Sequence, residues 1–574
     1  MAASDGGASS SASSGASKAL KRYGPIGVVA LVVAGVIAFA GGGDDGVNTV
    51  GTTSTTAAGG GGDRPATFQE AEAAGNADSI DWGSGCDTAT GTVKIPIAAA
   101  PPCIEPWDPS QDNGGSTTRG VTADEILVAL YKGQPDPLQQ AIVEGAGADT
   151  DPNAVNQTSQ DYINLFTDVY ETYGRTVKVV NVEASGGPDD ATAAQADALK
   201  AIDLEPFAVI GGPTTSAWYQ EITNAKIICV GCATATPAPD VAAVAPYLWP
   251  TGPTPEQADE HLLEMVGKQL VGKPADFAGD PDLQAKPRVF GWVQAETQTD
   301  QYKARNDAFE EAFDADYGGQ IATRFTYLFE PAKGADIGTT AIARMKEAGV
   351  TTVILSTDPL IPANITKEAT AQNYFPEWII GPSVLADTTI FGRTYDQEQW
   401  AHAIGLGLTT ARGPRESTDS YLVYDWYFGT KPPVNSQAVL APGPARFALG
   451  VHLAGPKLTP ETFAQGLFRV PRAEPALTTA RDSWGEGVWS DTDYNSSDDA
   501  TTLWWDPTAT GKDETGNEGT GMLAYVDGGR RYLPGEWPSD PIPWFDKTGA
   551  VTVYTERPDP APDYPAWPGS PAAG

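Results

Sequence analysis

Two short turns rich in hydroxyl groups are the first features of this 574-residue chain that could bind a ligand. The first is Gly212-Pro213-Thr214-Thr215-Ser216, which follows an apolar, strand-like run and opens a helical pattern. A helix that begins there offers free backbone N–H groups and the positive end of its dipole, and the three hydroxyls add further donors. This combination suits a carboxylate. The alternative, that Thr215 or Ser216 only caps its own helix, stays open.

The second hydroxyl-bearing turn contains Thr234 and Thr236 and follows the strand predicted over residues 226–230. Parallel strands bring their carboxyl ends to one edge of a sheet, where ligands of open α/β folds bind. We therefore predict that both turns line one cleft. For these two threonines as well, ligand contact and purely local hydrogen bonding remain open.

Acidic residues at two later strand ends could receive an ammonium group. Glu296 follows the strand predicted over residues 288–293, and Asp358 follows the strand predicted over residues 351–355. The alternative for both is a solvated surface carboxylate. Trp292 could wall the same cleft or belong to the core. The predicted ligand-binding set is Thr214, Thr215, Ser216, Thr234, Thr236, Trp292, Glu296 and Asp358.

Signatures of catalysis are missing from the sequence. It contains no Gly-x-Ser-x-Gly, His-Glu-x-x-His or Gly-x-x-x-x-Gly-Lys-Ser/Thr motif, and no Gly-x-Gly-x-x-Gly follows a strand. The three histidines are isolated, and the acidic run 491–499 has Ser496 where a calcium loop needs glycine. We expect no catalytic residues, no metal site and no cofactor, and therefore not an enzyme.

The charge of the chain limits its partners. It carries 36 Lys and Arg against 74 Asp and Glu, a net charge of −38, and its pI is about 4.3. Nucleic acid is excluded as a partner because binding to phosphates needs an excess of Lys and Arg. A hydrophobic fraction of 41% excludes general disorder and allows a sizeable core.

The N-terminus has the pattern of an export signal. Lys18, Lys21 and Arg22 precede an apolar run over residues 26–40, and an acidic Gly-rich stretch follows. Residues 1–43 are predicted to be a signal peptide or an N-terminal membrane anchor, and both alternatives stay open. In either case the bulk of the protein is extracytoplasmic, secreted or tethered to the cell membrane.

The four cysteines fit an oxidising compartment. Cys86 and Cys103 lie in a loop-like stretch and are predicted to form a disulfide. Cys229-Val230-Gly231-Cys232 has the spacing of a redox motif but follows a strand instead of starting a helix. We favour a local structural disulfide between Cys229 and Cys232 over redox catalysis.

Alternating strand and helix patterns define the organisation of the chain. Residues 44–119 are predicted to be a flexible tether and a disulfide-stapled lead-in. A strand–helix succession then repeats twice, which indicates an α/β fold with two doubly wound parallel-sheet lobes. The predicted first lobe covers residues 120–252, with 433–470 returning to it, and the second covers 253–432. Residues 471–574 are predicted to be a loop-rich C-terminal extension.

Four segments resemble a known family. Residues 120–128 (GVTADEILV) are similar to its opening strand, and residues 207–216 (FAVIGGPTTS) to its first binding turn. Residues 226–236 (KIICVGCATAT) and the helices of 446–467, with LTPE at 458–461, follow in the same order. The family is that of the type I periplasmic binding proteins, specifically the leucine-binding-protein-like substrate-binding proteins of branched-chain amino acid ABC transporters.

This resemblance implies two lobes joined by a hinge and a monomer that captures a small polar ligand in the interlobe cleft. The ligand would be an amino acid or a related organic acid or amide, and the partner a membrane permease. The family's aromatic–Gly pair after the first strand of the second lobe is absent here. The alternative function is a ligand-sensing module of the cell envelope without a transport role.

Overall fold

The computed structural model describes residues 64–134, 151–213, 215–296, 302–328, 330–383, 385–473, 475–489, 491–552 and 561–573. The predicted signal or anchor and most of the predicted tether lie outside these ranges. Within them, no helix has both the length and the apolar character that crossing a membrane requires.

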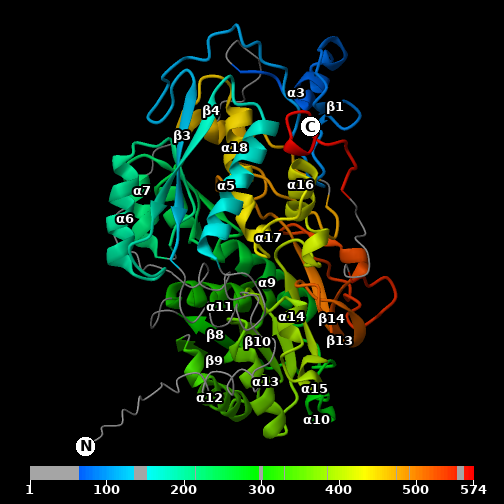
Figure 1. Ribbon diagram of the computed structural model, residues 1–574. Helices are drawn as coiled ribbons and strands as arrows, with labels where there is room; N and C mark the ends of the chain where they lie inside the picture. Colours follow the sequence, from blue (N-terminus) through cyan, green and yellow to red (C-terminus); the bar gives the residue numbers. More distant parts are fainter. Residues whose placement is uncertain are drawn as a thin grey trace, which may run out of the picture.

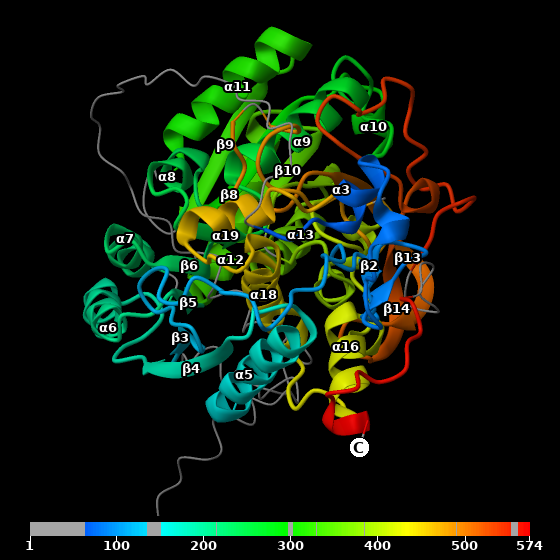
Figure 2. The same cartoon turned by 90° about the horizontal axis from the view of Figure 1, so that it is seen from above.

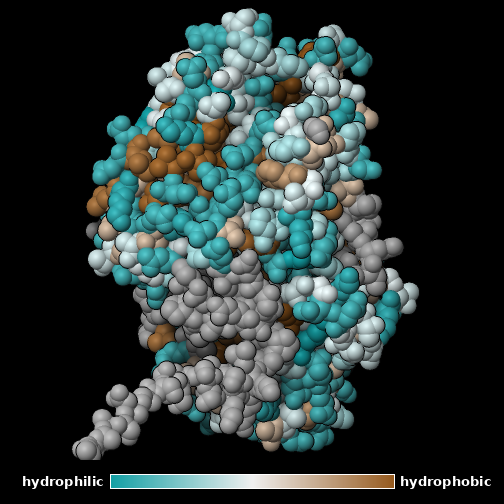
Figure 3. Space-filling model, viewed as in Figure 1, coloured by the Kyte–Doolittle hydropathy of each residue, from teal (hydrophilic) through white to brown (hydrophobic). Residues whose placement is uncertain are grey.

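The first lobe is a parallel sheet of five strands in the order β4-β3-β5-β6-β7. Strands form in the segment 120–128, in the apolar run before Gly212 and in residues 226–230, as the sequence predicts. Strand β4 lies at the edge, and Figure 3 shows apolar side chains gathered over this part of the lobe. The strands are β3 (Glu125–Lys132), β4 (Thr176–Glu183), β5 (Ala208–Ile210), β6 (Ile228–Thr234) and β7 (Leu248–Thr251), and the helices between them are α5 (Pro152–Val169), α6 (Ala191–Asp203), α7 (Ser216–Asn224) and α8 (Ala238–Ala243).

The second lobe repeats the same strand order. Its parallel part runs β9-β8-β10-β11-β12, and the two lobes lie one above the other in Figure 1. The strands are β8 (Phe290–Glu296), β9 (Ile321–Leu328), β10 (Thr352–Ser356), β11 (Glu377–Ile380) and β12 (Ala403–Gly407). The helices are α9 (Pro255–Gln269), α10 (Pro281–Gln284), α11 (Lys303–Tyr317), α12 (Gly334–Glu347), α13 (Ile361–Ala371), α14 (Thr389–Gly392) and α15 (Gln397–Trp400). The predicted α/β architecture of two parallel-sheet lobes is confirmed.

The prediction of a loop-rich extension over residues 471–574 is wrong for residues 500–512, whereas the apolar run 521–526 does indicate a short strand. Strands β13 (Ala500–Lys512), β14 (Glu518–Tyr525) and β15 (Arg531–Tyr532) extend the second sheet, with β13 antiparallel to β12. Asp506 and Pro507 interrupt the apolar pattern of β13 in the sequence. The register of β13 against β14 shifts between Asp506 and Thr510, and Pro507 lies in this irregularity, a position that tolerates proline.

Helix α16 (Asp419–Phe428) packs on the first lobe, although the sequence placed residues 253–432 in the second. The Tyr162 hydroxyl of α5 donates to the Ser420 carbonyl at 2.8 Å, and the Tyr424 hydroxyl of α16 donates to Asp161 at 2.8 Å. The sequence pattern of a helix does not reveal which lobe the helix covers. The predicted end of the second lobe at residue 432 therefore lies too far along the chain. Helices α17 (Gln437–Leu440), α18 (Pro442–Ala454) and α19 (Pro460–Leu467) follow, and α18 lies between α5 and α19 in Figure 2.

The lead-in before the first lobe is held by the predicted Cys86–Cys103 disulfide. It contains α3 (Phe68–Ala73), β1 (Cys86–Asp87) and β2 (Thr92–Val93). The Tyr564 hydroxyl donates to Asp87 at 2.9 Å, so the C-terminal residues 561–573 reach this lead-in (Figure 1). The second predicted disulfide, Cys229–Cys232, is also present.

Buried carboxylates lie where the chain crosses from α19 back to the second sheet. Asp493 is 7% exposed, and one of its carboxylate oxygens has no hydrogen-bond partner among the described residues. Burial, with a smaller contribution from Asp498, raises the pKa of Asp493 to about 7, against the opposing charge of Arg446. The folded protein therefore binds this proton more tightly than the unfolded chain does.

We expect the variant Asp493→Asn to be more stable than the wild type at pH 8. Because the folded-state pKa lies above the unfolded value, the contribution of Asp493 to stability falls as the pH rises from about 4 to about 7. The variant lacks this loss, so its advantage in free energy of unfolding should grow to more than about 1 kcal/mol over that range. Urea unfolding of both proteins at pH 4.5 and pH 8 measures this difference in the free energy of unfolding. A difference that does not change with pH would contradict the raised pKa of Asp493.

Candidate functional site

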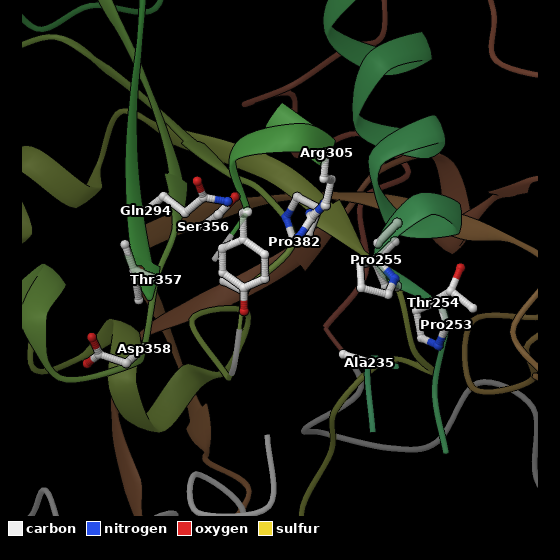
Figure 4. Close-up of a pocket in the computed structure, with 15 residues that line it drawn as sticks. Ala235, Pro253, Thr254, Pro255, Gln294, Arg305, Ser356, Thr357, Asp358 and Pro382 are labelled. Carbon is white, nitrogen blue, oxygen red and sulfur yellow. The ribbon is translucent and has the colours of Figure 1, made fainter. Parts of the chain in front are cut away.

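A cavity of about 180 Å³ lies at the carboxyl ends of the second lobe's strands. Gln294 and Ala295 end β8, Ser356 ends β10, and Thr357 and Asp358 follow it. Strands β8 and β10 are neighbours at the point where the strand order reverses, which is where open α/β sheets bind ligands. The crossing from β7 to α9 and a turn of the first lobe close the other side, as Figure 4 shows for Pro253, Thr254, Pro255 and Ala235.

Two hydrogen bonds fix the start of α9, where the chain crosses between the lobes beside the cavity. The Thr254 hydroxyl accepts from the Gln257 backbone N–H at 3.1 Å, and the Gln257 side chain accepts from the Thr254 N–H at 2.8 Å. This capping box, with Pro255 in the first helical turn, satisfies backbone donors at the helix start. These hydrogen bonds fix the start of α9 on this side of the cavity.

Gln294 and Ser356 present neutral hydrogen-bond donors to the cavity. The Gln294 Oε1 accepts from the Asn306 amide at 2.6 Å, and the described residues show no partner for the Gln294 amide N–H groups. The Ser356 Oγ accepts the indole N–H of Trp292 at 3.0 Å, which leaves the Ser356 hydroxyl hydrogen free to donate. Trp292, predicted to wall the cleft, lies fully buried behind it and positions Ser356.

Thr357 and Ser383 add two unpaired hydroxyls. Both residues line the cavity, and neither hydroxyl oxygen has a hydrogen-bond partner among the residues that the structure describes. A buried polar group left unpaired costs about 1–3 kcal/mol, which a ligand can recover. These hydroxyls are therefore candidates for hydrogen bonds to a ligand.

Asp358 lines the cavity, but its carboxylate is already engaged. The backbone N–H groups of Leu360 and Ile361 donate to Oδ1 at 2.8 and 2.9 Å, and the Tyr327 hydroxyl donates to Oδ2 at 2.5 Å. Burial raises the pKa of Asp358 despite these bonds. The carboxylate thus fixes the start of α13.

Arg305 is the other charged side chain of the described lining. Its Nε and Nη2 donate to the two carboxylate oxygens of Asp259, each at 2.5 Å. Burial disfavours the charge, but Asp259 outweighs it and the pKa of Arg305 is raised. The guanidinium stays charged, is neutralised by Asp259, and keeps its Nη1 donors unused.

The predicted first-lobe residues lie mostly beside the cavity. The Thr215 hydroxyl accepts from the Ala217 N–H at 3.4 Å and so caps α7, as the open alternative allowed. Ser216 and Thr236 are buried and do not line the cavity, whereas Ala235 does. Thr214 and the side chain of Thr234 lie outside the described part of the chain. In the second lobe, Glu296 is buried next to the lining residue Ala295.

The sequence interpretation missed Gln294, Ser356, Thr357, Ser383 and Arg305. The first three lie at the same strand ends as Glu296 and Asp358, so the strand-end rule could have found them. At the second-lobe strand ends, only the acidic residues and Trp292 stand out in the sequence as ligand-binding candidates, whereas these neutral side chains do not. Ser383 and Arg305 follow β11 and open α11, and no local signal distinguishes them. Across the described residues, no group of three His, Cys, Asp or Glu could hold a metal ion.

The two sheets have the same strand order. The cavity lies at the carboxyl ends of the second-lobe strands, next to a turn of the first lobe. The chain has the fold of the type I periplasmic binding proteins. No protein-family model matches the sequence, and no curated protein matches it.

Solved structures with the type I periplasmic binding fold are similar to this chain. The leucine-, isoleucine-, valine-, threonine- and alanine-binding protein from Brucella ovis is 13% identical, with a TM-score of 0.49 over 73% of this chain and 97% of that one. A solute-binding protein from R. palustris in complex with 4-hydroxybenzoate is 13% identical, with a TM-score of 0.47 over 70% and 97%. A fatty acid ABC transporter substrate-binding protein from Thermomonospora curvata is 15% identical, with a TM-score of 0.45 over 74% and 96%.

Proposed function

We propose that this protein is an extracytoplasmic solute-binding protein that captures a small polar ligand between its lobes and presents it to an ABC importer permease. The supporting observation is the cavity at the β8–β10 strand ends, lined by the unpaired hydroxyls of Thr357 and Ser383. The export pattern of residues 18–45 supports a location outside the cytoplasm.

Ligand capture follows from the position of the cavity between the lobes. A ligand that hydrogen-bonds to second-lobe strand ends and touches the first-lobe turn at Ala235 binds the closed arrangement better than an open one. Closure then buries the ligand and gives a permease a distinct shape to recognise. The chemistry is binding alone.

A thermal-melt screen of the whole protein against amino acids, organic acids and amides tests this function. A ligand at 100 times its Kd adds about 2.7 kcal/mol of stability, which should raise the Tm of lobes of this size by roughly 5–10 °C. Uptake of the same ligand should be lost when the protein is deleted from its host. Binding with unchanged uptake would overturn the transport role and leave a ligand sensor.

The variant Thr357→Val should weaken binding of the ligand found by this screen about 2- to 12-fold. It removes a hydrogen bond worth about 0.5–1.5 kcal/mol and keeps the side-chain shape. Isothermal titration calorimetry measures the change. The exposed Thr340 of α12 provides the control, because Thr340→Val should leave the Kd unchanged. An unchanged Kd for Thr357→Val would show that the Thr357 hydroxyl does not bond to the ligand.

A further inference from the structure

A second cavity, of about 380 Å³, lies where the chain passes between the lobes for the second and third time. Residues 408–418 connect β12 to α16, and residues 468–499 connect α19 to β13. Both connections contribute to its wall, together with the first-lobe helices α5 and α16, which lie side by side in Figure 1. We call it the hinge cavity. Among the described residues, none lines both this cavity and the one at the β8–β10 strand ends.

Much of the wall of the hinge cavity is apolar, and the cavity is open to solvent. Two of its lining residues, Thr410 and Ala438, are exposed, so a small molecule can enter past them. Such a mixture of apolar wall and a few polar groups is typical of small-molecule sites. The apolar residues include Phe166 of α5, Val423 of α16, Ala441 and Ala445 at α18, and Ile97 of the lead-in.

Asp482 places a carboxylate in the wall of the hinge cavity. Its backbone pairs with Ser497 in an antiparallel bridge, and the N–H of the next residue, Ser483, donates to the Ser496 carbonyl at 3.2 Å. This pairing fixes the position of Asp482 in the third connection. No described residue donates a hydrogen bond to its carboxylate. The carboxylate therefore keeps its capacity to accept hydrogen bonds from a ligand.

The charges around Asp482 do not satisfy it. Burial raises the pKa of Asp482 to about 7, and Asp499 and Asp498 add to this effect, whereas Arg446 and Arg531 oppose it. Arg531 donates to Asp499 at 2.8 Å, and the hydrogen bonds described for both arginines go to groups other than Asp482. A cation that bonds directly to Asp482 would therefore stabilise its charged form.

The other polar groups of the hinge cavity are mainly acceptors. Asp419 provides a second carboxylate in the wall. The Ser417 hydroxyl donates to the Pro414 carbonyl and the Thr418 hydroxyl to the Arg415 carbonyl, each at 2.7 Å. A hydroxyl that has donated its hydrogen can only accept further bonds. Carboxylates and accepting hydroxyls together suit a ligand that donates several N–H groups.

We propose that the hinge cavity is a second ligand-binding site, which takes a small organic ammonium ion. The ammonium group donates to Asp482, and the apolar chain or ring of the ligand packs on Phe166 and Val423. A hydrogen bond between an ammonium group and a carboxylate is about twice as strong as one between neutral groups, so Asp482 dominates the recognition. The site is independent of the proposed solute capture in the other cavity.

Matched pairs of amine and alcohol test this site. The probes are benzylamine with benzyl alcohol and butylamine with butan-1-ol, which have similar shapes and differ in charge. Binding to the whole protein is measured by calorimetry at pH 8, where Asp482 is ionised and the amines are protonated. The amine should bind at least about tenfold more tightly than its alcohol, a difference of about 1.4 kcal/mol. An alcohol that binds as tightly as its amine, or no binding of either amine, overturns the proposal.

The variant Asp482→Asn assigns the binding to the hinge cavity. It keeps the size of the side chain and removes its charge, so the amines should bind at least about tenfold more weakly. The exposed Asp203 at the end of α6 provides the control, because Asp203→Asn should leave the Kd of the amines unchanged. Thr357→Val should also leave it unchanged. Amine binding that survives in Asp482→Asn, or that Thr357→Val weakens instead, overturns the proposal.

The pH dependence of amine binding gives a second readout. Because the pKa of Asp482 is about 7, its carboxylate is mostly neutral at pH 5.5 and mostly charged at pH 8. Binding of benzylamine to the wild type should therefore tighten about tenfold or more over this range. Asp482→Asn should lose this dependence although Asp493 and Asp498 still titrate. The same pH dependence in both proteins would assign the effect to another group and overturn the proposal.

Discussion

Replacing Glu377 by alanine is expected to lower the free energy of unfolding by about 3–5 kcal/mol, because it leaves a buried charge without its partner. Arg288 donates to both carboxylate oxygens of Glu377 at 2.8 Å, and the two side chains are 2% and 0% exposed. The Phe277 N–H at 2.9 Å and the Thr352 hydroxyl at 2.6 Å donate to the same carboxylate. Urea unfolding followed by circular dichroism measures the loss.

An exposed ion pair of the same lobe provides the control for Glu377. Glu330 and Lys333 are 46% and 60% exposed, so Glu330→Ala should cost no more than about 1 kcal/mol. Equal losses in the two variants would show that burial does not distinguish these ion pairs.

Replacing Trp505 by alanine is expected to cost about 3–5 kcal/mol through the cavity that it leaves in the second lobe. Trp505 is fully buried in β13, and its indole N–H donates to the Gln397 side chain at 2.9 Å. Its ring packs so closely on Gly392 that a Cβ there would approach it to 2.4 Å. Thermal unfolding should show the loss in the transition of the second lobe.

An exposed leucine provides the control for Trp505. Leu199 on α6 is 56% exposed, and Leu199→Ala should change the stability by no more than about 0.5 kcal/mol. A small effect of Trp505→Ala would mean that β13 contributes little to the second core.

The elements of the parallel sheets could be predicted because their signals are local. Strands such as β10 are wholly buried and therefore read as apolar runs, and helices such as α19 begin directly after a capping threonine, Thr459, with a proline in their first turn. Strand β13 gave no such signal. Its pairing with β12 joins segments that are distant in the sequence, and its polar residues are compatible with a loop.

The candidate site could be located from the sequence more closely than its chemistry could be described. The strand-end rule indicates the edge of the second sheet at which the cavity lies, and Asp358 is part of its lining. The use of its carboxylate to hold α13 depends on Tyr327, whose position in the next strand of the sheet no local pattern reveals. The neutral donors became visible only once the side-chain partners of Trp292 and Asn306 were known.

The late arrival of β13 has a consequence for how the protein is made. Synthesis and export proceed from the N-terminus, so β12 emerges with one edge unpaired and keeps it so until α16 to α19 and the last crossing have followed. An open strand edge is a template for wrong pairing between chains. The second lobe therefore completes its sheet only after nearly the whole chain has been made, and a chain stopped before residue 500 would be prone to aggregation.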